Sequence, residues 1–398
     1  MLLEFSCGHF RGLHDPQRLS LVASADRSHR ERNSVALSGR SLRALKASAL
    51  FGAAGAGKTT FLQAAAALRY AVTESASWST TVGLPIGGLA AAPGPSGPTE
   101  FEVLVERAGV RYDYGLALTS RGVEREWLVV YPQARPQRWF ERERAGDGSE
   151  WRWWFGPRFP EEPRRCRALR DSTSGTALFL STAVAMGCDA LLPVFASIAD
   201  GLRVRVGPDD GDGATSLALM RMPSGRDRMT QFLADFGVPV LGLELGADDG
   251  DGVVIVRPGA GGLGMPQRIP MNVESGGVRR LFDLAADLFH VVDTGGTLLI
   301  DDLDRGLHPN VTRQLVELFL NERINPGGAQ IVFTTHDTAL LDQALLRRDQ
   351  VWFMEEGIDG RRRLYPLLEF SPRRDEALAR GYERGRYGAV PLLRAQSV

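Results

Sequence analysis

The chain has 398 residues, of which 43% are hydrophobic and 24% are charged, and its formal net charge is -1. These values are ordinary for a globular protein with a large core, built either as one domain with insertions or as two closely joined lobes. They exclude a globally basic nucleic-acid binder, so any contact with DNA or RNA would need a local patch.

The cysteines and the apolar stretches favour a cytoplasmic protein. Cys7, Cys166 and Cys188 are far apart and match neither a disulfide framework nor a CxxC metal pattern. The opening segment, MLLEFSCGHFRGL, carries polar and charged residues where a signal peptide needs an unbroken apolar core. The most apolar long stretch, 177–202, is interrupted by an aspartate and a proline and is too short to cross a membrane. We therefore predict a buried helix there, a cytoplasmic location and no membrane partner.

The first part of the chain predicts short strands followed by a helix. Residues 2–5 and 19–23 have the pattern of short strands, and 47–51 has that of a buried strand. The alanine-rich run 58–72 contains no helix breaker and predicts a helix. A strand, a glycine-rich loop and a helix should therefore follow one another.

The next part predicts an antiparallel lobe. Glycine, proline and alanine dominate 84–98, which indicates a loop or a lobe boundary. Beyond it, 101–107, 110–118 and 127–131 alternate in the manner of strands. These strands are close enough in sequence to form hairpins.

The segment 156–264 mixes a helical stretch with two acidic, glycine-rich turns, near Asp209 and Asp248, and reads as an insertion. Neither turn has the spacing and terminal glutamate of a calcium loop, so we interpret both as solvated hairpin turns.

After residue 271, helices and strands alternate regularly. The predicted elements are a helix at 277–293, a strand at 297–301, a helix at 310–322, a strand at 330–335, a helix after Asp337 and a strand at 351–355. Such alternation predicts a parallel sheet covered by helices on both faces. We expect four parts: 1–92 as an N-terminal lobe, 93–155 as an antiparallel β lobe, 156–270 as a partly helical insertion and 271–398 as a C-terminal lobe.

The strongest motif is GAAGAGKT at 52–59, which fits GxxxxGK[ST] between a predicted strand and a predicted helix. Its backbone amides can curl around phosphates, Lys58 can reach the β and γ phosphates, and the Thr59 hydroxyl can ligate Mg²⁺. We expect ATP to contact Gly52, Gly55, Ala56, Gly57, Lys58, Thr59 and Thr60.

A second acidic element follows the predicted strand 297–300. Asp301 stands where a carboxylate can hold Mg²⁺ at the carboxyl edge of the sheet, as in a Walker B motif. Asp302 stands where many such ATPases place a glutamate that polarises the attacking water. An aspartate is one methylene shorter, so we expect slow hydrolysis. The alternative is that both aspartates only cap the following turn.

Three weaker signals complete a split nucleotide site. His336 follows the strand 330–335, so its imidazole could contact the γ-phosphate, although a lone histidine is often structural. Ser275, Gly276 and Gly277 precede a predicted helix and could cradle an anion held by another subunit. His308, which precedes a proline, fits a helix start and a dimer contact equally well.

These motifs and their surroundings resemble the AbiL-like family of bacterial AAA/ABC-type ATPases, which occurs in abortive-infection and other phage-defence loci and is related to SMC, RecF and overcoming-lysogenization ATPases. The resemblance spans the opening segment, the P-loop, FEVLVERAGVRYDYGLAL, EREWLVVYP, ESGGVRRLF, LLIDDLDRGLHPN, NPGGAQIVFTTHDTALLDQALLRRDQVWF and GYERGRYGAVPLL. Two departures affect the expected turnover rate: Asp302 replaces the family's usual glutamate, and Val278 stands where a threonine is common.

The resemblance implies an α/β P-loop NTPase of ABC/SMC-head type with an antiparallel β lobe and a helical insertion. It also implies an ATPase that converts ATP and water to ADP and phosphate, dimerises around ATP, and controls a nuclease or toxin effector in phage defence. The expected partners are a second copy and that effector, with a nucleic-acid partner left open.

Three other functions compete with this interpretation. A DNA-repair or recombination head of RecF/SMC type would use local basic and aromatic residues, for which the candidates are Arg135, Arg138, Trp139, Phe140, Arg142 and Arg144. An ordinary solvated hairpin explains those residues as well. A transporter subunit usually carries a longer LSGGQ signature, and a self-contained nuclease would need more chain after His336 or a second carboxylate cluster.

Overall fold

The computed structural model describes residues 1–37, 41–78, 97–133, 135–146, 150–207, 214–246, 252–259 and 264–391. Most of the predicted loop 84–98 and the acidic turns near Asp209 and Asp248 lie outside these residues. The described part is a mixed α/β structure with two large sheets and two small ones. In this part of the chain, every helix is too short or too polar to span a membrane.

The antiparallel lobe is a seven-stranded sheet in the order β10-β9-β8-β7-β6-β1-β2, with every pair antiparallel. Its strands are β1 (Leu2–Gly8), β2 (Gln17–Ser20), β6 (Thr99–Arg107), β7 (Val110–Thr119), β8 (Gly122–Tyr131), β9 (Gln137–Arg144) and β10 (Trp151–Phe155). Burial alternates along β6, which is the pattern of a strand with one face on a core. The sheet takes strands from both sides of residue 92, where we expected one part of the chain to end.

The second large sheet has the order β11-β15-β16-β5-β17-β18 and is parallel except for β18. Its strands are β11 (Leu202–Arg205), β15 (Thr297–Ile300), β16 (Gln330–Thr334), β5 (Ala47–Phe51), β17 (Val351–Glu356) and β18 (Arg362–Pro366). Every residue of β5, β15 and β16 is buried. Continuous apolar runs are typical of parallel strands covered on both faces, so the predicted α/β class is confirmed.

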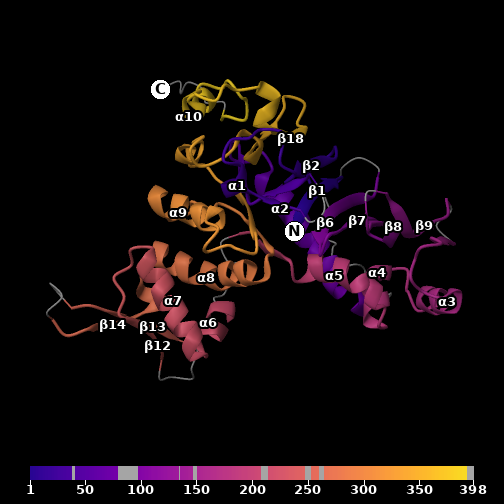
Figure 1. Cartoon of the computed structure of the whole chain (residues 1–398), viewed down its shortest axis with the longest axis horizontal. Helices are drawn as coiled ribbons and strands as arrows, with labels where there is room; N and C mark the ends of the chain where they lie inside the picture. Colours follow the sequence, from indigo (N-terminus) through magenta and orange to yellow (C-terminus); the bar gives the residue numbers. More distant parts are fainter. Residues whose placement is uncertain are drawn as a thin grey trace.

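Alternate residues of the parallel sheet enter two different cores. Leu50 and Val332 pack in the core that contains the seven-stranded sheet and α2 (Lys58–Glu74). Ala49 and Ile331 pack in the core that contains α8 (Gly276–Thr294) and α9 (Pro309–Leu320). The parallel sheet is therefore the middle layer between an antiparallel sheet with α2 and a layer of helices (Figure 1).

The insertion contains helices and a small sheet. Its elements are α3 (Pro163–Asp171), α4 (Phe179–Ala185), η3 (Asp189–Leu191), α5 (Leu192–Ala199), α6 (Ala214–Met220), α7 (Pro223–Asp235), β12 (Gly242–Leu245), β13 (Val253–Arg257) and β14 (Gln267–Pro270). The single buried helix predicted at 177–202 is wrong. Gly187 adopts a φ of 79°, which ends α4, and Leu202 already belongs to β11. The insertion thus supplies an edge strand to the parallel sheet.

The helix predicted after Asp337 is also wrong, because only the short 3-10 turn η6 (Thr338–Leu340) forms there. The Asp337 carboxylate accepts a hydrogen bond from Ala339 N at 2.9 Å, which closes this turn. Leu341, Leu345 and Leu346 are buried beyond it, so tertiary packing orders the segment. The remaining short elements are α1 (Arg30–Asn33), β3 (Ser34–Ala36), β4 (Arg43–Leu45), η1 (Ser75–Ser77), η5 (Met271–Val273), η7 (Arg348–Gln350), η8 (Leu367–Phe370) and α10 (Leu378–Glu383).

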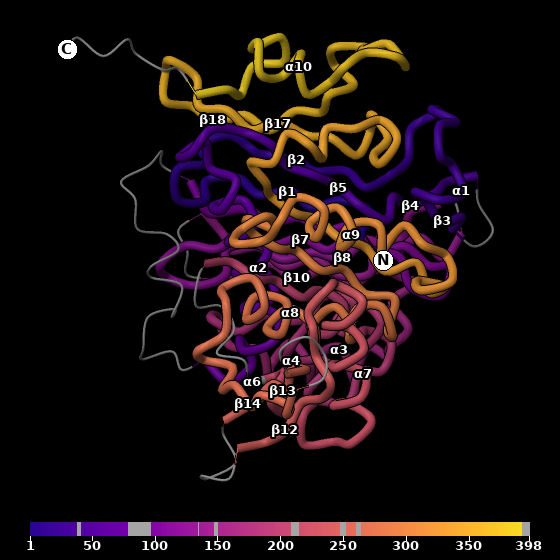
Figure 2. The backbone as a smooth tube through the Cα atoms, turned by 90° about the vertical axis from the view of Figure 1, so that its left-hand side faces the viewer, coloured from indigo at the N-terminus to yellow at the C-terminus, as the bar shows by residue number. Residues whose placement is uncertain are grey.

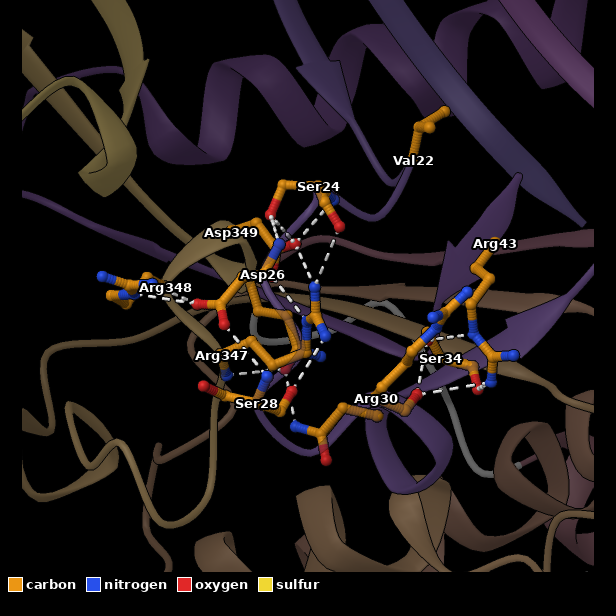
Figure 3. A network of polar contacts seen from close by, with 12 residues as sticks. Val22, Ser24, Asp26, Ser28, Arg30, Ser34, Arg43, Arg347, Arg348 and Asp349 are labelled. Atoms are coloured by element: carbon orange, nitrogen blue, oxygen red, sulfur yellow. Dashed lines mark hydrogen bonds and ion pairs between the residues drawn. The ribbon is translucent and has the colours of Figure 1, made fainter. Parts of the chain in front are cut away.

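The N-terminal and C-terminal parts of the chain lie side by side, as the indigo and yellow segments of Figure 2 show. A polar network joins them through the residues that directly precede β17 in the chain (Figure 3). Arg347 pairs with Asp349 at 2.7 Å and donates to Ser28 O at 2.8 Å, and Arg348 pairs with Asp26 at 2.6 Å. Burial alone would raise the pKa of Asp26, but hydrogen bonds from Ser28 and Arg348 lower it to about 2. The ionised Asp26 carboxylate therefore links the N-terminal part of the chain to Arg348 in the C-terminal part.

Candidate nucleotide site

The P-loop follows β5 directly and leads into α2, so the predicted strand-loop-helix order is confirmed. Gly52 is packed so closely that a Cβ atom there would lie 2.2 Å from Met354 O. Gly57 is the N-cap of α2 and adopts a φ of 104°, in the left-handed region that glycine tolerates best. The loop thus presents its backbone at the N-terminus of a 17-residue helix, a favourable place for an anion.

Lys58 is turned inward in the structure and is only 5% exposed. Its Nζ donates to Gly52 O at 2.8 Å and to Ala53 O at 3.1 Å, and it lies 3.3 Å from Nε2 of His336. Burial lowers the pKa of Lys58, while the carboxylates of Asp302, Asp301 and Asp304 oppose that shift. Lys58, His336 and the aspartates after β15 therefore share one site.

Asp301 lies directly beside the P-loop helix. Thr59 donates its hydroxyl hydrogen to Asp301 Oδ2 at 2.8 Å, and Thr334 donates to Asp301 Oδ1 at 2.7 Å. The Thr334 hydroxyl also accepts from Asp302 N at 2.8 Å. The end of β16 thus fixes both aspartates.

Asp302 adopts a φ of 46°, in the left-handed region. Among residues with a Cβ, asparagine and aspartate tolerate this region best. The backbone therefore gives a local reason for aspartate where related ATPases carry glutamate.

Asp304 belongs to the site although sequence reasoning did not single it out. Its Oδ1 accepts from the Thr335 hydroxyl at 2.7 Å and from His336 N at 3.4 Å. It thereby connects the loop after β15 to the residue that carries the imidazole. The only sequence signal is a third aspartate in LLIDDLD, and nothing in that spacing shows which strand end it contacts.

The Ser275–Gly277 element lies at the start of α8, where Ser275 is the N-cap and accepts from Val278 N at 3.4 Å. Ser275 and Gly276 are exposed. In the described part of the chain, no hydrogen bond joins Ser275, Gly276 or Gly277 to the P-loop. A different residue of α8, Arg280, reaches the site by donating from Nη2 to Asp301 O at 3.3 Å. The structure therefore brings together Lys58, Thr59, Asp301, Asp302 and His336, while Ser275–Gly277 make no hydrogen bond to these residues in the described part of the chain.

Two other sequence candidates have structural explanations. His308 is the N-cap of α9, and its Nδ1 accepts from Asn310 N at 3.2 Å, while its proposed dimer contact stays a prediction.

In the arginine-rich hairpin, Phe140 and Arg142 are fully buried, and Arg142 pairs with the buried Glu126 at 2.8 Å. These two side chains cannot contact nucleic acid in this fold. Arg135 and Arg138 are exposed, Arg144 and Trp139 are half-buried, and Arg138 pairs with Glu141 at 2.6 Å.

Comparison with known proteins identifies a family that this chain matches. The family model described as "AAA domain, putative AbiEii toxin, Type IV TA system" matches residues 47–164 and 263–342, about half of the chain. Those ranges include the P-loop, Ser275–Gly277, Asp301, Asp302 and His336. No curated protein matches the chain significantly.

Among solved structures, the chain is similar to the SMC head domain from Thermotoga maritima, with 16% identity and a TM-score of 0.43 over 92% of this chain and 98% of that one. It is also similar to an SmcHead bound to the C-winged helix domain of ScpA, with 11% identity and a TM-score of 0.44 over 92% and 96% of the two chains. Likeness at this level does not extend to function. By the family match and the P-loop fold together, the chain belongs to this AAA domain family of P-loop ATPases.

Proposed function

We propose that this protein binds ATP with Mg²⁺ at the P-loop, dimerises around the nucleotide, hydrolyses it slowly and thereby controls a partner effector in the cytoplasm. One observation carries the proposal: Thr59 Oγ1 and Asp301 Oδ2 are hydrogen-bonded at 2.8 Å. This bond joins the end of the P-loop to the carboxylate after β15, at the carboxyl edge of a parallel sheet. Ligands of such sheets bind at that edge.

The donor set at this point suits Mg²⁺, which prefers oxygen ligands. Thr59 and Asp301 are the residues that would hold the ion, and their mutual hydrogen bond would then be exchanged for bonds to it. When bound, Mg²⁺ supplies positive charge to the β and γ phosphates. Thr334 keeps the carboxylate in position through its 2.7 Å bond to the other oxygen of Asp301.

The phosphates of ATP would replace the hydrogen bonds that Lys58 makes to carbonyl oxygens of the P-loop. Lys58 now satisfies its ammonium group with Gly52 O and Ala53 O, and a polyphosphate offers it stronger, charged acceptors. The backbone amides of the loop complete the cradle, and the candidate contacts are Gly52, Gly55, Ala56, Gly57, Lys58, Thr59 and Thr60. ATP binding therefore needs no change in the position of α2.

Hydrolysis would depend on Asp302 and His336. Asp302 directly follows Asp301, its backbone N donates to Thr334 at 2.8 Å, and its carboxylate acts on the pKa of Lys58, which supports a role for it close to the phosphates. It would accept a proton from the attacking water, and its short side chain accounts for the slow rate that we propose. His336 lies 3.3 Å from Lys58 Nζ, where its imidazole could contact the γ-phosphate.

The dimer supplies what a single chain lacks. Ser275, Gly276 and Gly277 stand at the N-terminus of a 19-residue helix, and the exposed hydroxyl of Ser275 and the free amides of the first turn can bind an anion. Because these three residues are not hydrogen-bonded to the P-loop within the described part of the chain, we propose that they close on ATP held by a second copy. The family description names a toxin and a toxin–antitoxin system, which supports a toxin-type effector as the further partner and phage defence as the role.

Light scattering with and without ATP and Mg²⁺ tests the dimer, and phosphate release tests hydrolysis. We expect the mass to double with ATP in wild type and in Asp302→Asn, with the variant's dimer persisting longer. A mass that ATP leaves at the monomer value in both proteins would contradict the sandwich. Co-expression with the product of a neighbouring gene, followed by copurification with and without ATP, tests effector control.

A further inference from the structure

β10 forms one end of the seven-stranded sheet and is paired on one side only. The sheet order ends at β10, and its neighbour in the described part of the chain is β9. β9 lies on the opposite side of the molecule from α9 (Figure 1). An open edge strand presents a row of main-chain donors and acceptors that can pair with another strand.

Residues 151, 153 and 155 direct their main-chain groups to this open edge. Gly156, directly after β10, donates from N to Trp139 O on β9 at 2.8 Å. Because main-chain groups alternate in direction along a strand, residues 152 and 154 also bond to β9, and the odd-numbered residues point the other way. Within the described residues, no hydrogen bond involves the N–H and C=O groups of Trp151, Trp153 and Phe155.

The outer face of β10 carries an exposed cation and an exposed aromatic ring. Arg152 and Trp154 are the exposed residues of the strand, and Trp154 is 43% exposed. In the described part of the chain, Arg152 takes part in no hydrogen bond or ion pair, even with Glu143, the residue opposite it on β9. The strand also contains no proline, lysine or bulge, which are features that usually keep an edge strand from pairing.

Arginine and tryptophan already pair across the strands at this end of the sheet. Trp151 is opposite Arg144, and Trp153 is opposite Arg142. The guanidinium carbons lie 4.8 Å and 5.3 Å from the centroids of the rings opposite them. A guanidinium group over an indole ring is attracted by the ring's quadrupole. Cross-strand stacking of arginine on tryptophan therefore joins β10 to β9 on the inner face of the sheet.

A second copy of β10 can form the same kind of pair on the outer face. When two copies run antiparallel about Trp153, Arg152 of each copy is opposite Trp154 of the other. On the inner face, Trp151 of each copy is opposite Phe155 of the other. The odd-numbered residues then form the hydrogen-bonded pairs, so each of their free main-chain groups finds a partner. The sequence WRWWF is therefore complementary to itself in this register.

We propose that β10 pairs with β10 of a second copy, antiparallel and centred on Trp153, and thereby joins two seven-stranded sheets into one. The contact is symmetric, because the same residues serve both copies. β10 contains no residue of the nucleotide site, so the pairing needs no ATP and does not rest on the dimer of the proposed function. A five-residue edge buries less surface than a standard interface, so this dimer should dissociate on dilution.

The first test is cross-linking through introduced cysteines, in which Arg152→Cys is mixed with Trp154→Cys and oxidised glutathione is added. The proposed register sets these two positions opposite each other in a non-hydrogen-bonded pair, with Cα atoms about 4.5 Å apart, which suits a disulfide. We expect a cross-linked dimer in the mixture and little in either variant alone, because identical positions of the two copies are offset along the strands. Wild type should not cross-link, since Cys7, Cys166 and Cys188 are buried.

A mixture of Arg152→Cys with Glu143→Cys is the matched control. Glu143 is exposed on the same face, but it lies on β9, one strand further from the edge. This mixture should not cross-link, because two strand spacings separate the cysteines in the proposed pairing. Equal cross-linking in both mixtures, or none in the mixture of Arg152→Cys with Trp154→Cys, would overturn the proposal.

The second test is sedimentation without ATP, at concentrations up to the limit of solubility. Wild type should shift from monomer to dimer as the concentration rises. Trp154→Lys places a second cation opposite Arg152 in both halves of the contact and should weaken the dimer by at least about 10-fold. Adding Arg152→Glu to that variant makes the charges opposite and should restore the dimer, while urea unfolding checks that both variants keep the fold. Wild type that stays monomeric without ATP but dimerises with it would contradict this proposal and leave the proposed function standing.

Discussion

Thr59 and Asp301 are joined by a 2.8 Å hydrogen bond although 242 residues separate them in the chain. The bond connects the start of α2, the helix that follows β5, to the end of β15, and β16 lies between β15 and β5 in the sheet. Asp301 has a second fixed contact, from Thr334 at 2.7 Å. In the proposed site, Mg²⁺ would replace the hydrogen bond between Thr59 and Asp301 with a bond to each of the two oxygens, while Thr334 keeps the Asp301 carboxylate in position.

Lys58→Ala should abolish ATP binding and leave the fold intact. The lysine donates only to loop carbonyls and lies near His336, so its loss should change the free energy of unfolding by about 1 kcal/mol. Calorimetry with ATP and Mg²⁺ measures the affinity, and urea unfolding measures the stability. Lys46→Ala is a matched control, because Lys46 is also buried but lies before the P-loop strand. Wild-type affinity in Lys58→Ala would refute the P-loop assignment.

Substitutions of Asp302 should distinguish its effect on the rate of ATP hydrolysis from its effect on the free energy of unfolding. Asp302→Asn should lower single-turnover hydrolysis, because an amide cannot accept the water's proton, and it should keep the fold because asparagine tolerates a φ of 46°. Asp302→Glu should raise hydrolysis without changing ATP affinity. It should also reduce the free energy of unfolding by about 1 kcal/mol, because glutamate fits the left-handed region less well. If hydrolysis is the same in both variants and in wild type, Asp302 is only a structural residue.

Removing the charge of one partner of the buried pair Glu126 and Arg142 should strongly destabilise the fold. Both side chains are fully buried at 2.8 Å, and the carboxylate also accepts from Phe179 N at 2.7 Å and Leu180 N at 2.9 Å, at the start of α4. Glu126→Gln leaves the guanidinium without its counter-charge, so we expect a loss of about 3–5 kcal/mol in urea unfolding. Glu143→Gln, at an exposed position of β9, serves as the control and should change stability by less than about 0.5 kcal/mol.

The stability of the antiparallel sheet should fall as the pH rises through the weakly acidic range. Burial and the nearby Glu102 carboxylate together raise the pKa of Asp113 from 3.8 to about 6, against the opposing effect of Arg18. The folded chain therefore holds a proton that the unfolded chain has lost, which stabilises the fold below the folded pKa and is lost as pH rises from about 4 to about 6. Asp113→Asn should flatten this part of the stability profile, measured by urea unfolding at several pH values. A profile identical to that of wild type would show that Asp113 does not cause the pH dependence.

Local sequence was sufficient for the parts of the fold that depend on neighbouring residues. The apolar run of β5, the glycines of the P-loop and the alanine-rich start of α2 act over a few residues, so pattern and propensity predict the strand, loop and helix. The same holds for β15, α9 and β16. Local pattern failed at 177–202, where Gly187 ends a helix and the following residues supply an edge strand of the parallel sheet.

What the sequence by itself determined was the set of chemical groups at the strand ends, and hence the hypothesis of an ATP site. Only the tertiary structure decided which groups meet. It placed Asp304 against Thr335, brought Arg280 of α8 to the main chain of Asp301, and buried Arg142 where the sequence suggested a charged surface. The physical reason is that these contacts depend on strand order and on the electrostatics of burial. Both are properties of residues that are far apart in the chain, so no local pattern contains them.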